Sequence, residues 1–112
     1  MNPEHPSILL VEDDASLRNL LAEELELDGY RVETAASAEE GQRKAVAAVP
    51  DLIVSDLRLP DEDGLSVLRA LQAAGHSVPF IIITAFGTVD QAVEALKAGA
   101  DDFLTKPLST DH

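Results

Sequence analysis

Short apolar runs alternate along the chain with longer segments in which apolar residues recur every three or four positions. The runs at 7–11, 51–56 and 79–84 are rich in Ile, Leu and Val, which predicts buried β-strands. The segment 31–35 alternates polar and apolar residues, and this pattern predicts a strand at the edge of a sheet. A fifth strand is predicted within 101–107, DDFLTKP.

Helical spacing between these runs predicts four helices, at 15–28, 37–49, 66–74 and a last one that begins at Thr88 or Asp90 and ends at Gly99. Glycine follows or ends three of the four, at positions 29, 75 and 99, as expected for helix C-termini. Ser37 and Glu40 have the spacing of a capping box, in which the two residues satisfy each other's backbone amides at a helix start.

Strands that are continuously apolar are typical of a parallel sheet covered by helices on both faces. We therefore expect one α/β domain over residues 1–112, with a polar arm at 1–6. Its predicted core is a doubly wound, five-stranded parallel sheet in the order 2-1-3-4-5. In such folds ligands bind beyond the carboxyl ends of the strands.

Polar and charged residues stand at those predicted strand ends. Glu12 and Asp13 follow the first strand, Asp56 ends the third, Thr84 ends the fourth and Lys106 follows the fifth. Strands one and three are neighbours in the predicted order, so Asp13 and Asp56 should lie close together. The sequence thus predicts three carboxylates, one hydroxyl and one ammonium at a single pocket.

Three carboxylates within a few ångströms need a compensating proton or cation. Lys106 offers one positive charge, and Mg²⁺, which one or two carboxylates commonly hold, would supply the rest. A carboxylate can also attack phosphorus to form an aspartyl phosphate, and the surrounding cations would stabilise the transferred group. Such a pocket could therefore support phosphoryl transfer if Mg²⁺ is bound, while a protonated carboxylate is the alternative.

Composition narrows the possible partners. With 8 basic and 21 acidic residues the net charge is −13, which disfavours direct binding to nucleic acid or to an anionic membrane. The chain has no cysteine, and its first residues, MNPEHPS, lack the basic and apolar regions of a signal peptide. No apolar run approaches the roughly 20 residues that a membrane span needs. These features predict a cytoplasmic domain.

Four segments, ILLVEDDASLRNLL, DLIVSDLRLPDEDG, FIIITAFG and GADDFLTKPL, resemble the receiver (CheY-like) domain of two-component response regulators. They agree with that family in order and spacing, and the resemblance covers nearly the whole chain. It implies a flavodoxin-like fold and a role as a signalling phosphoacceptor. It also implies that the chain is not an enzyme, beyond catalysing its own phosphorylation and dephosphorylation.

The resemblance assigns roles residue by residue. Asp56 matches the phosphoacceptor, which takes a phosphoryl group from a histidine kinase or a phosphotransfer protein. Asp13 matches the direct Mg²⁺ ligand, Glu12 matches an acid that acts through metal-bound water, and the backbone carbonyl of Arg58 matches a third ligand. Glu at position 12 departs from the commoner Asp. Two further matches are Thr84, the switch hydroxyl, and Lys106, the lysine that pairs with the phosphoryl group.

Phe103 matches an aromatic switch position, although an aromatic residue in a strand can equally be a core residue. In the implied mechanism Thr84 moves towards the phosphoryl group, Phe103 turns into the vacated space, and the surface of the fourth helix and fifth strand changes. The resemblance is strongest to receivers of the nitrogen-regulator class, which precede a sigma-54-dependent AAA+ ATPase and a helix-turn-helix. That output machinery is absent from these 112 residues, so a transcriptional output and a stand-alone adaptor both stay open.

Two other classes fit the sequence less well. A haloacid-dehalogenase-type phosphohydrolase needs a second Asp two residues after its nucleophile, where Arg58 stands. A flavodoxin-like FMN binder needs a loop rich in Ser, Thr and Gly after the first strand, but this loop is acidic and would repel phosphate. Asp14, the third acid of that loop, fits a helix start instead, where the dipole favours a negative charge.

The family normally has a fifth helix after the lysine, but only six residues follow Lys106. We therefore expect a receiver domain truncated before or within that helix, with apolar surface left on one face of the sheet. Uncovered apolar patches commonly lead to association, so self-association is predicted.

Overall fold

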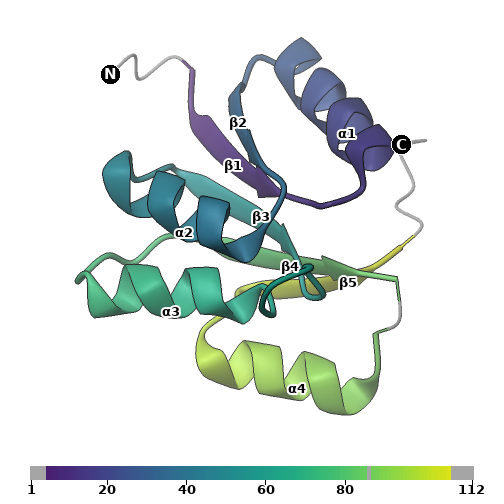
Figure 1. Cartoon of the computed structure of the whole chain (residues 1–112), viewed down its shortest axis with the longest axis vertical. Helices are drawn as coiled ribbons and strands as arrows, with labels where there is room; N and C mark the ends of the chain where they lie inside the picture. Colours follow the sequence, from purple (N-terminus) through teal and green to yellow (C-terminus); the bar gives the residue numbers. More distant parts are fainter. Residues whose placement is uncertain (1–4, 86, 107–112) are drawn as a thin grey trace.

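Five parallel strands form one sheet in the order β2-β1-β3-β4-β5 in a computed structural model, which describes residues 5–85 and 87–106 (Figure 1). This confirms the predicted fold class and strand order. The strands are β1 (Ser7–Val11), β2 (Arg31–Ala35), β3 (Leu52–Asp56), β4 (Phe80–Thr84) and β5 (Asp102–Thr105).

Four helices connect the strands within the described residues: α1 (Ala15–Leu27), α2 (Ala38–Ala47), α3 (Leu65–Ala73) and α4 (Val89–Ala98). In Figure 1, α1 lies on one side of the sheet, and α2, α3 and α4 lie on the other. The prediction of α2 extended two residues too far, because Ala48 already has extended backbone angles (φ −146°, ψ 91°). The glycines after α1, α3 and α4 have the positive φ angles expected at helix ends.

The helix starts differ from the sequence prediction in one detail. Ser37 caps α2 as predicted, since its side chain accepts the N–H of Glu40. The Glu40 carboxylate, however, accepts the N–H of Ala36 at 2.7 Å and not that of Ser37, so the predicted capping box is only half formed. The complete capping box lies at the start of α4, between Thr88 and Gln91.

The two faces of the sheet are covered to different extents. The core cluster lies on the α2–α4 face and includes Leu9, Val11, Ile53, Phe80 and Ile82, all at most 2% exposed. On the other face, α1 contributes no fully buried residue. Half-buried or exposed apolar side chains remain on that face of the sheet, at Leu52, Val54, Ile81 and Leu104.

This pattern agrees with the expectation of a lightly covered face. Self-association, the truncation and the domain bounds stay predictions.

Within residues 5–85 and 87–106, none of the helices has the length and apolar character that crossing a membrane would require.

Candidate functional site

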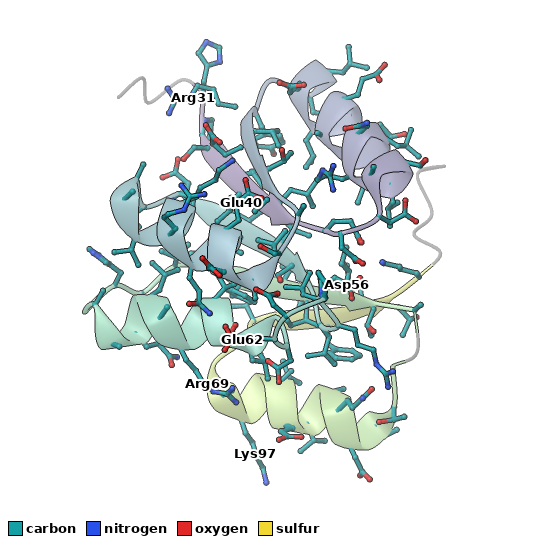
Figure 2. All side chains as sticks on the ribbon, in the orientation of Figure 1. Arg31, Glu40, Asp56, Glu62, Arg69 and Lys97 are labelled. Atoms are coloured by element: carbon teal, nitrogen blue, oxygen red, sulfur yellow. The ribbon has the colours of Figure 1, made fainter. Side chains whose placement is uncertain are left out.

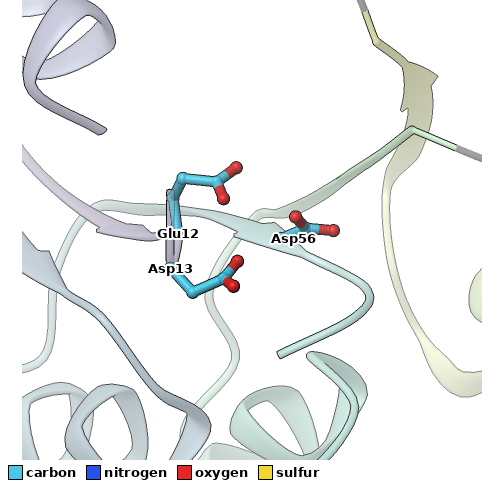
Figure 3. A group of neighbouring side chains, drawn as sticks. All are labelled: Glu12, Asp13 and Asp56. Atoms are coloured by element: carbon cyan, nitrogen blue, oxygen red, sulfur yellow. The ribbon is translucent and has the colours of Figure 1, made fainter. Parts of the chain in front are cut away.

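Three carboxylates meet at the carboxyl edge of the sheet, as predicted. Strands β1 and β3 pair in parallel with Val11 beside Ser55, so Glu12 and Asp13 emerge next to Asp56. Each of the three offers an oxygen within 4.8 Å of the other two. Figure 3 shows the carboxylates of Glu12 and Asp13 at the end of β1, pointing to the same side as that of Asp56.

Glu12 is completely buried, which is unusual for a carboxylate. Its Oε2 accepts the N–H of Asp14 at 3.0 Å. Its Oε1 lies 2.7 Å from Lys106 Nζ as an ion pair, yet the direction of approach does not make a well-formed hydrogen bond, and Oε1 has no other partner among the described residues. Burial raises the pKa of Glu12, and the nearby charge of Asp56 adds to this effect.

Asp56 is held through both of its carboxylate oxygens. Oδ1 accepts the backbone N–H of Arg58 at 3.1 Å, and Oδ2 accepts Lys106 Nζ at 2.8 Å. The side chain is 8% exposed, so it is nearly buried but still open to solvent. A carboxylate can accept about four hydrogen bonds, which leaves capacity on both oxygens for a cation or an incoming group.

Lys106 bridges Glu12 and Asp56 with one ammonium group. Its position is set by the sheet, because its own N–H donates to the carbonyl of Thr84 at 2.8 Å. Burial by itself lowers the pKa of Lys106, but the hydrogen bond to Asp56 and the close negative charges of Asp56 and Glu12 outweigh it and raise the pKa. The lysine is therefore charged at neutral pH.

The loop between β1 and α1 carries acids with separate roles. Asp13 is exposed and faces the shared site, whereas Asp14 turns back to accept the N–H groups of Ser16 and Leu17. This confirms the predicted capping role of Asp14. Sequence reasoning missed Arg18, whose Nη1 donates to the carbonyl of Glu12 at 2.9 Å and holds the loop against α1.

Thr84 and Phe103 lie on the two neighbouring strands beyond β3. Thr84 is 1% exposed and pairs in register with Thr105. Phe103 is half-buried and packs against the core cluster. A Cβ atom placed on Gly87 would lie 2.7 Å from Cε1 of the Phe103 ring, so this ring lies against the loop after β4. Both the core and the switch interpretation of Phe103 agree with this position.

Gly64 is a second residue that sequence reasoning missed. A Cβ atom there would lie 2.0 Å from the carbonyl oxygen of Asp56, which is closer than a side-chain carbon can approach an oxygen. Its φ of −64° is ordinary, so close approach and not backbone conformation requires glycine. A glycine directly before an apolar helix was the available signal.

The residues fit a hard divalent cation. Together the three carboxylates carry three negative charges when ionised, and Lys106 supplies only one positive charge in the described part of the chain. The buried Oε1 of Glu12 lacks a well-directed donor, and Asp13 is open to solvent. Oxygen ligands of this kind suit Mg²⁺ or Ca²⁺.

Comparison with known proteins identifies the family to which most of the chain is similar. The family model for the response regulator receiver domain matches residues 8–112. The C4-dicarboxylate transport transcriptional regulatory protein DctD of Rhizobium meliloti is 38% identical over 96% of this chain and 23% of its own length. The transcriptional regulatory protein PrrA of Mycobacterium leprae is 42% identical over 91% of this chain and 44% of its own length.

Solved structures agree. The crystal structure of a Burkholderia pseudomallei response regulator, described with a phosphorylated aspartic acid, calcium ion and citrate, superposes with a TM-score of 0.85 at 30% identity, covering 93% of this chain and 61% of that one. The chain spans less than half the length of the curated relatives named above. Its fold, its acidic site and these matches show that the chain belongs to the response regulator receiver domain family.

Proposed function

We propose that this chain is a phosphorylation-dependent switch in which Asp56 accepts a phosphoryl group from a histidine kinase or a phosphotransfer protein. The observation that carries the proposal is the meeting of Glu12, Asp13 and Asp56 within 4.8 Å, with Lys106 bridging two of them. In this role the chain is a phosphoacceptor and not an enzyme with its own substrate turnover.

The transfer is a nucleophilic displacement at phosphorus. A carboxylate oxygen of Asp56 forms the new P–O bond, the P–N bond of the donor phosphohistidine breaks, and the imidazole leaves with the electron pair and takes a proton. Lys106 already contacts Oδ2 at 2.8 Å, so it can pair with a phosphoryl oxygen when the group arrives. The N–H of Arg58 keeps the carboxylate oriented through Oδ1.

A Mg²⁺ ion would be held by Asp13, by Asp56 and by the backbone carbonyl of Arg58, with Glu12 acting through metal-bound water. When bound, the ion would neutralise charge on the transferring phosphoryl oxygens. The acidic cluster supports this role, as does the relative whose structure is described with both a phosphorylated aspartic acid and a calcium ion. Arg18 and Asp14 would keep the loop after β1 in place.

The switch would act through Thr84 and Phe103, which lie on β4 and β5. Movement of Thr84 towards the phosphoryl group would free space for the Phe103 ring, and the α4–β5 surface would change. A population shift of this kind needs a free-energy difference of only a few kcal/mol. Because its relatives are transcriptional regulators, the changed surface would control a transcriptional output in the cytoplasm, with a stand-alone adaptor as the alternative.

A small-molecule phosphodonor tests the proposal directly. With Mg²⁺ present, mass spectrometry should show a gain of one phosphoryl group, which is lost in Asp56→Ala and after chelation of the metal. Asp90→Asn, at an exposed acid in the first turn of α4, is the matched control and should still be labelled. Labelling that persists in Asp56→Ala, or sustained turnover of a phosphomonoester as a hydrolase would give, would contradict the proposal.

A further inference from the structure

The loop between β3 and α3, residues 57–64, is tied to a helix that follows a different strand. The carboxylate of Asp61, near the tip of this loop, accepts two backbone amides at the start of α2. Oδ1 accepts the N–H of Ala38 and Oδ2 accepts the N–H of Glu39, each at 2.9 Å. The first amides of a helix have no partner within the helix, so this contact caps α2 from a distance of more than 20 residues in sequence.

A second contact joins the same two segments. Nε2 of Gln42 lies 3.0 Å from Oε2 of Glu62 and 2.9 Å from Oγ of Ser66. Glu62 lies in the loop between β3 and α3, beside α2 (Figure 2). The loop is thus attached to α2 at two successive residues.

The same loop reaches the phosphoacceptor at its base. Arg58 donates its N–H to Oδ1 of Asp56 and forms an isolated antiparallel bridge with Asp63. The N–H of Gly64 donates to the carbonyl of Leu57 at 2.7 Å, which closes the loop. The position of the loop therefore decides the position of the Arg58 backbone relative to the Asp56 carboxylate.

Helix α2 is in turn anchored to the strand that carries the other acids. A Cβ atom on Gly41 would lie 3.0 Å from a methyl group of Val11, so the helix packs closely on β1 directly before Glu12. These contacts connect β1 to α2, α2 to the loop through Asp61, and the loop to Asp56. Asp61 links the half of the site on β1 to the half on β3.

We infer that Asp61 is a positioning residue for the cation and phosphoryl site, although it contacts neither. Its carboxylate holds the β3–α3 loop against α2, and this fixes Arg58 relative to Asp56 and to the acids after β1. The inference rests on the proposed function and extends it to a residue outside the site. Two charge-assisted hydrogen bonds to amides at a helix N-terminus make the tie strong for an exposed side chain.

The test compares Asp61→Ala with Ser37→Ala. Both substitutions remove a side-chain cap from α2, but only the first releases the loop, because Ser37 accepts the N–H of Glu40 within its own helix. Mg²⁺ affinity is measured by calorimetric titration, and the rate of phosphorylation by a small phosphodonor. Thermal unfolding establishes that the two variants fold and lose similar stability.

Outer-shell partners of a metal site typically change affinity 10- to 100-fold. We expect Asp61→Ala to weaken Mg²⁺ binding about tenfold, at the low end of that range, and to slow labelling of Asp56. Ser37→Ala should leave both unchanged. Asp61→Asn keeps one acceptor oxygen, folds more readily and should fall between the wild type and Asp61→Ala.

Equal Mg²⁺ affinities in Asp61→Ala and Ser37→Ala would overturn the inference. Any loss of Mg²⁺ binding would then come from the weakened helix α2 and not from release of the loop. If Asp61→Ala does not fold, an unchanged affinity in Asp61→Asn overturns it in the same way. A wild-type chain that binds no Mg²⁺ and takes no phosphoryl group would overturn the proposed function and this inference with it. The wild-type measurement therefore separates the two failures.

Discussion

Two runs of three acids, residues 12–14 and 61–63, look alike in sequence but do different things in the structure. In the second run each carboxylate has a donor: Asp61 accepts two amides of α2, Glu62 accepts Gln42, and Asp63 accepts the N–H of Leu65. All three are exposed to solvent. Each of these acids has a hydrogen-bond donor of its own, and together they hold a loop in place.

In the first run Asp14 accepts two amides, and one oxygen of Glu12 accepts the N–H of Asp14. Glu12 is fully buried with an ammonium shared between it and Asp56, and Asp13 shares its space with both. Three carboxylates that face one another, with one ammonium shared between two of them, could bind a cation. The comparison shows that two equally dense acidic runs can differ in arrangement: one brings carboxylates together at a candidate cation site, and in the other each carboxylate binds a separate donor and holds a loop.

The largest expected effect lies where the two runs meet. Gly64 follows the second run and touches the backbone of Asp56, so Gly64→Ala forces a Cβ atom to within 2.0 Å of a carbonyl oxygen. We expect a loss of about 3 kcal/mol or more in the free energy of unfolding, the upper end of overpacking effects. Urea denaturation measures it. Gly75→Ala, whose Cβ atom would meet nothing within 4 Å, is the contrast and should cost about 1–2 kcal/mol for its positive φ alone.

A neighbouring pair of substitutions tests the division of roles within the first run. Asp13→Asn removes the charge of a proposed Mg²⁺ ligand and should weaken Mg²⁺ binding by at least the 10- to 100-fold seen for outer-shell partners. Asp14→Asn keeps an effective helix cap and should leave Mg²⁺ binding within about twofold, because Asn and Asp cap helices about equally well. Calorimetric titration distinguishes them. Equal losses in the two variants would show that net charge matters and that the individual positions do not.

The buried member of the first run should give a distinctive pH dependence. The pKa of Glu12 is raised, chiefly by burial, so in metal-free protein the folded state favours its protonated form. The stability that Glu12 contributes to the folded state is therefore fully present at pH values below its pKa in the unfolded chain. It is lost as the pH rises from that value through the higher pKa of the folded state. Glu12→Gln cannot titrate, so we expect its free energy of unfolding to increase relative to that of the wild type as the pH rises.

Melting curves without Mg²⁺, from acid to neutral pH, measure this difference. Saturating Mg²⁺ should reverse the order by stabilising the wild type, by about 2.7 kcal/mol at 100 times the dissociation constant. A stability difference between the two proteins that does not change with pH would contradict the prediction.

The smallest expected effect is that of Asp61 in the second run, and its pH dependence runs opposite to that of Glu12. The N–H groups of Glu39 and Ala38 lower the pKa of Asp61. Its contribution is present at pH above its unfolded pKa and is lost as the pH falls through the lower folded value. Asp61→Asn should therefore differ from the wild type at neutral pH and converge with it in acid. A chemical shift titration of the Asp61 carboxyl checks the direction, and an unchanged or raised pKa would contradict it.

The amino-acid sequence alone was enough to predict the elements and the edge of the sheet at which the acids lie. The period of apolar residues is a local property, so it predicted five strands, four helices and the parallel arrangement. Because carboxyl ends of parallel strands share one edge, Glu12, Asp13, Asp56 and Lys106 could be assigned to one pocket from their places in the chain. The sequence did not show which helix start forms a full capping box. Ser37–Glu40 and Thr88–Gln91 have equivalent spacing, but only the second pair forms both hydrogen bonds.

Which donor each acid receives depends instead on the tertiary structure. Lys106 reaches Asp56 across 50 residues of sequence, and Asp61 reaches α2 across more than 20. Contacts over such separations depend on how the sheet order places loops side by side, and no local periodicity encodes them. The close approach of Gly64 to Asp56 arises in the same way. The place of the first run after a predicted strand already marked it as a site, but the hydrogen-bond partners of the second run come from elsewhere in the chain and could not be predicted.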